Sequence, residues 1–274
     1  MKPLLRYIEK PLAFVWRDFI DDASYKFAFL MQFVNMFITT SIFFFLSKLI
    51  GNVGKTYLEP YGGNYFSFVL IGVAFYSYLG VSMQSLTGTI RRGQMLGTLE
   101  ALLVTQTEIP TIIFSSSIYS FIWASLRVAV YLIMGAFIFG VNLANANLAG
   151  AFVMLFLTII SFASLGIISA SFIMVLKKGD PVSWLFTGIS GLLGGLYYPI
   201  SILPGWLQNL SYLLPVTYAL EGMRLAVLKG YSLSELLPNI LALFVFSIVM
   251  LPFSMLAFGF AVRKAKKDGT LTQY

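Results

Sequence analysis

The stretch Gly191–Gly230, GLLGGLYYPISILPGWLQNLSYLLPVTYALEGMRLAVLKG, decides which fold this sequence can adopt. It is apolar enough for a membrane, but Pro199, Pro204 and Pro215 interrupt it, and proline breaks or kinks a helix interior. Its tryptophan and tyrosines are typical of the headgroup level of a bilayer. Broken helices at membrane depth survive only when they pack in protein or line a cavity. The stretch therefore predicts a short span, followed by two short helices that enter the outer leaflet without crossing it.

The end of this stretch is too polar for the bilayer centre, because it carries Glu221, Arg224 and Lys229. We expect separate helices at Ile202–Leu210 and Val216–Leu228, because a proline favours the start of each. Together they are predicted to form a gate that is entered from outside. The gate residues are Pro199, Pro204, Pro215, Tyr218 and Glu221. The alternative is an ordinary extracytoplasmic loop with one amphipathic helix.

The composition indicates a membrane protein that binds no metal or cofactor itself. Of the 274 residues, 58% are hydrophobic and only 11% are charged, which is typical of a polytopic membrane protein. Cysteine and histidine are both absent. Disulfides, thiolate metal sites and the commonest general base are thereby excluded. We expect the net charge of +7 to reflect orientation in the bilayer, not nucleic-acid binding.

Apolar segments along the chain predict an all-α integral membrane fold in one transmembrane domain, residues 1–274. The six expected spans are residues 27–46, 65–90, 109–139, 149–176, 182–198 and 237–262. Residues 1–25 are predicted to form an interface helix on the cytoplasmic surface and not a cleavable signal. Residues 93–108 are too polar and too short to cross, and residues 199–230 form the re-entrant part. Recurring glycines in the fifth span predict a closely packed neighbouring helix.

Basic residues indicate the orientation of these spans. Thirteen of the 18 lysines and arginines fall on one side of the predicted membrane. They are Lys2, Arg6, Lys10, Arg17, Lys26, Arg91, Arg92, Lys177, Lys178, Arg263, Lys264, Lys266 and Lys267. Because cytoplasmic segments carry the excess of positive charge, we expect both termini in the cytoplasm of a multi-pass protein of the cell membrane.

Arg127 is the ionisable residue that lies deepest in a predicted span. Charged groups inside a span commonly mark a substrate path, so Arg127 is a candidate cavity charge for an anionic head group. Two other interpretations stay open: a structural pair with a carboxylate such as Glu221, and snorkelling to the interface.

The segment Gly97-Thr98-Leu99-Glu100-Ala101-Leu102-Leu103 resembles the GTLE-x-L motif of type-2 ABC transporter permeases. The proline-rich stretch before the last span and the order of six spans after a surface helix resemble the same family, over nearly the whole chain. The resemblance implies that a short coupling helix at 93–108 contacts a cytoplasmic ABC ATPase. The coupling residues it points to are Gly97, Thr98, Leu99, Glu100 and Leu103.

The resemblance also implies a function. Two such permeases pair, as a homodimer or heterodimer, and form the translocation path, whose outer end the gate would cap. ATP and Mg would be bound by the partner ATPase, because this chain lacks a nucleotide loop and is not itself expected to be an enzyme. The exported compound is expected to be a drug, a lipid or another amphipathic molecule, with a lipid-linked polysaccharide as the alternative.

Two other classes of function compete with this interpretation. An intramembrane enzyme would need clustered acid, base or metal groups, and no paired carboxylates occur within a predicted span. An ion-coupled secondary transporter would need membrane-embedded carboxylates and often shows an internal repeat, neither of which the sequence predicts. An ATPase partner would distinguish the permease from both.

Overall fold

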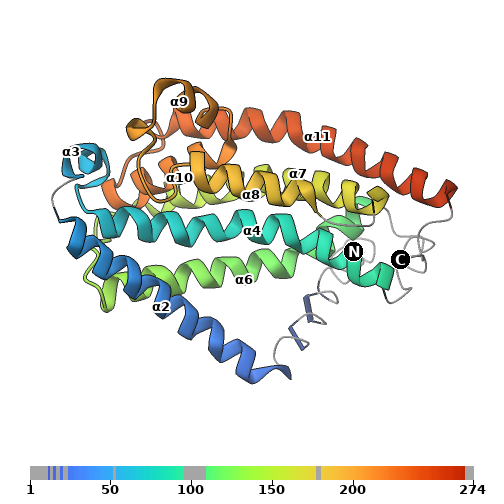
Figure 1. Cartoon of the computed structure of the whole chain (residues 1–274), viewed down its shortest axis with the longest axis horizontal. Helices are drawn as coiled ribbons and strands as arrows, with labels where there is room; N and C mark the ends of the chain where they lie inside the picture. Colours follow the sequence, from blue (N-terminus) through green and yellow to red (C-terminus); the bar gives the residue numbers. More distant parts are fainter. Residues whose placement is uncertain are drawn as a thin grey trace, which may run out of the picture.

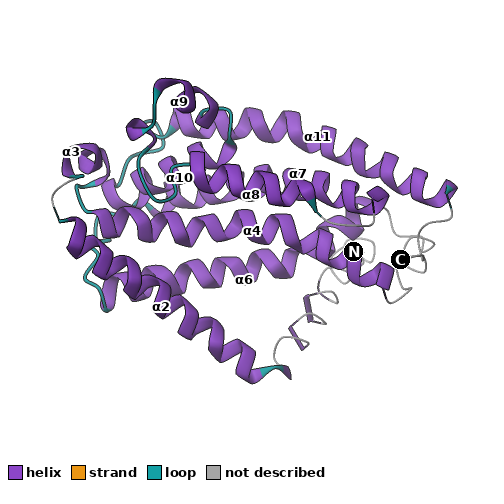
Figure 2. Ribbon diagram, in the orientation of Figure 1, coloured by secondary structure: helices purple, strands orange, loops and turns teal. Residues whose placement is uncertain are grey.

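The computed structural model describes residues 24–51, 54–95, 109–176 and 180–268, together with Leu12, Val15, Trp16, Phe19 and Ile20. These residues are all helical or in loops, and none forms a strand (Figure 2). An all-helical fold is thus confirmed for the part of the chain described. Most of the predicted interface helix at 1–25 and coupling helix at 93–108 lies outside the described residues.

Within the part of the chain that the structure describes, five helices are long and apolar enough to cross a membrane, judged by length and composition. They are α2 (Lys26–Ile50), α4 (Tyr65–Met95), α6 (Ile109–Phe137), α7 (Leu148–Leu176) and α11 (Leu237–Lys267). The remaining predicted span corresponds to α8 (Pro181–Leu193), which has 13 residues. At 1.5 Å per residue it is only about 20 Å long, shorter than a bilayer core. Five of the predicted spans are therefore confirmed as helices, and the count of six stays a prediction.

Short helices gather at one end of the bundle, where α4 begins (Figure 1). They are α3 (Lys55–Leu58), η1 (Glu59–Tyr61), η2 (Ile200–Ile202), α9 (Gly205–Ser211), α10 (Pro215–Arg224) and the π-helical turn η3 (Leu225–Lys229). Pro204 immediately precedes α9, and Pro215 is the first residue of α10. The two prolines thus lie at helix starts, where a missing N–H removes no intrahelical hydrogen bond. We call residues 194–230 the cap.

The core lies around α4 and α7. Figure 1 shows α4 between α6 on one side and the pair α7 and α8 on the other, and α4 packs most extensively against α6 and α7. Fully buried side chains include Tyr78 and Leu79 of α4 and Met154 of α7. Among their described residues, helices α2, α6 and α11 instead leave most of their apolar side chains exposed or half-buried. Apolar surface on this scale needs lipid or another chain to cover it.

Candidate functional site

Arg224, the last residue of α10, holds the cap to the bundle. Its side chain is only 2% exposed. Nε donates to the carbonyl of Phe68 at 3.1 Å, Nη1 to that of Gly195 at 2.8 Å and Nη2 to that of Leu196 at 2.9 Å. One side chain therefore joins α10 to the first turn of α4 and to the chain that follows α8. The sequence interpretation noted this arginine only for its polarity and did not place it in the gate.

The hydrogen bonding of backbone carbonyls explains how the helix can break after α8. Helix α8 ends at Leu193, and the last carbonyls of a helix have no intrahelical partner. Arg224 supplies donors to the carbonyls that follow, at the end of α8 where the helix dipole is negative. Gly72 of α4 leaves the room for this contact, because a Cβ there would lie 2.5 Å from Nη2 of Arg224. The backbone carbonyls that follow α8 are thus hydrogen-bonded by a protein side chain, which lipid could not do.

Aromatic rings surround the guanidinium. Its carbon Cζ lies 3.5 Å from the ring centroid of Phe68 and 6.0 Å from that of Tyr61, which is a cation–π arrangement. Burial lowers the pKa of Arg224 to about 9, so the group stays protonated at neutral pH. Burial also raises the pKa of Tyr61 to about 12. The site therefore holds a permanent positive charge in a nearly dry environment.

The predicted gate residues all fall within the cap. Glu221 lies one turn before Arg224 on α10; burial raises its pKa, and the charge of Arg224 opposes that shift. Among the described residues, the charged neighbour of Glu221 is thus Arg224, not Arg127. The hydroxyl of Tyr218 donates to the carbonyl of Tyr212 at 2.8 Å and joins α10 to the end of α9. Pro199 is buried in extended backbone after α8.

A second anchor holds the cap on the side of α7. The side-chain amide of Asn147 donates to the carbonyl of Tyr231 at 2.7 Å, and its backbone N–H donates to the carbonyl of Ala226 at 2.9 Å. Gly230 has a positive φ of 69° and packs against the backbone of Asn145, so a side chain would not fit there. The loop before α7 therefore fixes the π-helical turn that follows α10.

The other end of α8 is also fixed by polar contacts. Asp180 caps the helix, accepting a hydrogen bond from the backbone N–H of Ser183 at 2.9 Å. The same carboxylate oxygen accepts from the hydroxyl of Ser169 on α7 at 2.6 Å. Midway, the hydroxyl of Tyr76 on α4 donates to the carbonyl of Thr187 at 2.5 Å. Helix α8 is thus held at both ends and in the middle.

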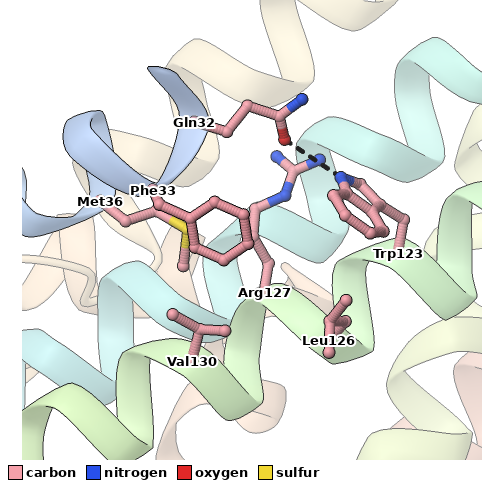
Figure 3. Close-up of a pocket in the computed structure, with 7 residues that line it drawn as sticks. All are labelled: Gln32, Phe33, Met36, Trp123, Leu126, Arg127 and Val130. Atoms are coloured by element: carbon pink, nitrogen blue, oxygen red, sulfur yellow. Dashed lines mark hydrogen bonds between the residues drawn. The ribbon is translucent and has the colours of Figure 1, made fainter. Parts of the chain in front are cut away.

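Arg127 lies between α2 and α6, away from the cap (Figure 3). Its side chain extends from α6 towards α2 and lies beside the hydrogen bond that Trp123 Nε1 donates to Gln32 Oε1 at 3.1 Å. The other lining residues of this shallow pocket are apolar; they are Phe33, Met36, Leu126 and Val130. Arg127 is half-buried at the centre of the apolar part of α6, ten residues from either end of Ser117–Phe137.

The coupling residues Gly97, Thr98, Leu99, Glu100 and Leu103 lie outside the described residues, so their prediction stays open. Within the ranges that the structure describes, no group of three or more acidic residues could hold a metal ion.

The apolar helices and the proline-broken cap define a multi-pass helical membrane protein. Residues 12–228 match the ABC-2 type transporter family, which is more than half of the 274-residue chain. The chain therefore belongs to the ABC-2 type transporter family. Its several apolar helices and this family fit a multi-pass location in the plasma membrane.

A relative supports this assignment at the level of the family. The chain is 21% identical over 160 residues to the linearmycin resistance permease protein LnrN of Bacillus subtilis (strain 168). The aligned part covers 58% of this chain and 41% of the relative, so the chain spans about two fifths of that protein's length.

Proposed function

We propose that this chain is the membrane-spanning subunit of an ATP-driven exporter. In this proposal it pairs with a second permease chain and is driven by cytoplasmic ATPase subunits through residues 93–108. The observation that carries the proposal is the family match, because residues 12–228 include both the GTLE segment and nearly the whole cap. The chain would form the path and its gate, while ATP and Mg are bound by the partner.

The polar contacts of α8 support six crossings. Ser169 lies 21 residues beyond Leu148 along α7, which is about 31 Å at 1.5 Å per residue and close to the thickness of a bilayer core. Asp180 contacts Ser169, and Leu196 contacts Arg224 beside the first turn of α4. Residues 180–196 therefore connect the two faces, although only 13 of them are helical. An even number of crossings places both termini on the cytoplasmic side that the basic residues indicate.

An exposed stripe on α8 supports a paired permease. Every third or fourth residue is apolar or small and exposed; these residues are Trp184, Leu185, Gly188, Ile189 and Leu192. The space at Gly188 is open for at least 4 Å. Phe43 of α2 stacks on Tyr197 just beyond this stripe, with ring centroids 5.7 Å apart, so α2 borders the same face. A second permease chain would cover this surface, which is otherwise left to lipid.

The expected substrate is an amphipathic compound. The relative named above is a linearmycin resistance permease, which favours export of an antibiotic-like molecule. Arg127 would meet an anionic group halfway across the bilayer, where charged side chains commonly serve transport. The side chains that line the small cavity beside Arg127 are apolar apart from Gln32 and the indole N–H of Trp123.

Co-purification tests the proposal. The chain should purify from membranes with an ABC ATPase, and the complex in proteoliposomes should hydrolyse ATP faster when an exported compound is added. A chain that transports without any ATPase would contradict the proposal and favour an ion-coupled transporter.

A further inference from the structure

The three hydrogen bonds of Arg224 join α10 to α4 and to the chain that follows α8, and we call them the Arg224 latch. Their acceptors are the carbonyls of Phe68, Gly195 and Leu196. Two acceptors follow α8 directly, and the third belongs to α4. Any movement that separates the end of α8 from α10 must break the bonds to Gly195 and Leu196.

Helix α10 is fixed, so the end of α8 is the part that can move against it. Eight of the ten residues of α10 are buried, and the helix packs on α4, α7 and α11. Helix α9 stays with α10, because the hydroxyls of Thr217 and Tyr218 donate to the carbonyls of Ser211 and Tyr212 at its end. The outer end must therefore open where the end of α8 separates from Arg224, while α10 stays packed on the bundle.

A buried guanidinium that loses its acceptors needs another partner, because an uncompensated buried charge is strongly unfavourable. Glu221 offers this partner. It lies three residues before Arg224 on the same helix, a spacing at which side chains on a helix surface are neighbours. The two charges already influence each other, although the hydrogen bonds of Arg224 go to carbonyls.

We propose that Arg224 is a two-state switch for the outer gate: it binds the carbonyls of Gly195 and Leu196 in the closed state and pairs with Glu221 when the gate opens. The proposal rests on the transport function proposed above. In this proposal the hydrogen bonds of Arg224 to Gly195 and Leu196 mark the closed state. Breaking the latch should make the gate open without substrate, whereas removing the charge of Glu221 should keep it closed.

A cysteine reporter tests both directions. The chain has no native cysteine, and Ser190, in the last turn of α8, is 2% exposed. Ser190→Cys should react slowly with a membrane-impermeant thiol reagent in intact cells. Gly72→Ala adds a Cβ that would lie 2.6 Å from the carbonyl oxygen of Leu196, so it should displace the latch and raise the labelling rate several-fold.

A control variant and a second latch variant accompany this test. Gly80→Ala changes the same helix where nothing lies within 4 Å, so labelling should equal that of the parent. Arg224→Lys, whose single ammonium cannot reach three carbonyls in a fixed fork, should also raise labelling if Gly72→Ala fails to reach the membrane. Equal labelling in Gly80→Ala and in whichever of the two latch variants is expressed would overturn the latch.

Glu221→Gln tests whether Arg224 exchanges its carbonyl acceptors for Glu221. Resting labelling of Ser190→Cys should stay slow, and the rise in labelling during ATP-driven turnover should disappear. A rise as large as in the parent would overturn the role of Glu221. Resting labelling needs no ATPase, so it reports on the latch even if the complex hydrolyses no ATP. A complex that hydrolyses no ATP would contradict the proposed transport function but not the latch.

Discussion

The backbone carbonyl of Ser82 on α4 rests directly against Gly166 on α7. A Cβ at position 166 would overlap this carbonyl oxygen, so glycine is what lets the two central helices approach. We expect Gly166→Ala to destabilise the protein by about 1–3 kcal/mol, the usual cost of overpacking a core. A clearly lower melting temperature in detergent would show this. Gly259→Ala, where the added methyl meets open space, should melt like the parent. Equal melting of both variants would refute the close approach.

The N-cap of α8 gives a second prediction. Asp180→Ala removes the acceptor for both the N–H of Ser183 and the hydroxyl of Ser169, whereas Asp180→Asn keeps an oxygen in the same place. Loss of an N-cap costs about 1 kcal/mol, so the alanine variant should unfold at a lower temperature than the asparagine variant. Thermal unfolding of purified protein compares the two. If alanine were as stable as asparagine, α8 would not depend on this cap.

The topology is testable because the chain has no native cysteine. Single cysteines at Ser24, Lys178 and Thr270 should resist an impermeant thiol reagent in intact cells, and cysteines at Asn52 and Gln208 should react. This pattern follows from six crossings with the basic segments inside. Labelling of Thr270 from outside together with protection of Gln208, with Ser24 still protected, would mean that α8 does not cross.

Arg127 provides a fourth prediction. Arg127→Ala should lower the transport of anionic amphipathic compounds while the protein keeps its melting temperature. Trp123→Phe removes the hydrogen bond to Gln32 and part of the ring but leaves the charge of Arg127, so it should have the smaller effect on transport. Transport assays in proteoliposomes, paired with thermal unfolding, separate the two roles. A large fall in melting temperature with normal specific transport would make Arg127 structural instead.

Much of the fold could be predicted from the sequence, because long apolar runs report directly on membrane helices. The expected span at 65–90 corresponds to α4, and that at 149–176 to α7, with boundaries within a few residues. The end of α8 was placed too late, at residue 198 instead of Leu193. The helix stops before Gly195, whose positive φ of 73° is not helical, and Arg224, 31 residues beyond Leu193, donates to the carbonyls of Gly195 and Leu196.

The candidate site was only partly predictable. Pro204 and Pro215 lie at the starts of α9 and α10 as expected, since helix breaks leave a local signal, while the gate role of Glu221 stays a prediction. Arg224 was missed because its role depends on three carbonyls that are distant in the sequence. A lone arginine inside an otherwise apolar stretch was the signal that could have found it. The glycines of the fifth span predicted a closely packed neighbouring helix. Gly191 does face Tyr76 of α4, whereas Gly188 faces open space within this chain.

The coupling segment carries the functional claim. We expect Glu100→Ala to leave folding and membrane insertion intact but to loosen the ATPase, because a charge at an interface fixes register more than it adds affinity. Leu99→Asp should be more severe, since it places a charge in the predicted apolar contact.

The direct measurement is a pull-down of the ATPase with each variant, combined with substrate-stimulated ATP hydrolysis in proteoliposomes. Our interpretation predicts reduced capture and reduced stimulation for Glu100→Ala, and loss of both for Leu99→Asp, at normal permease levels. Parental values of both quantities in both variants would contradict the interpretation of this chain as a permease driven through residues 93–108.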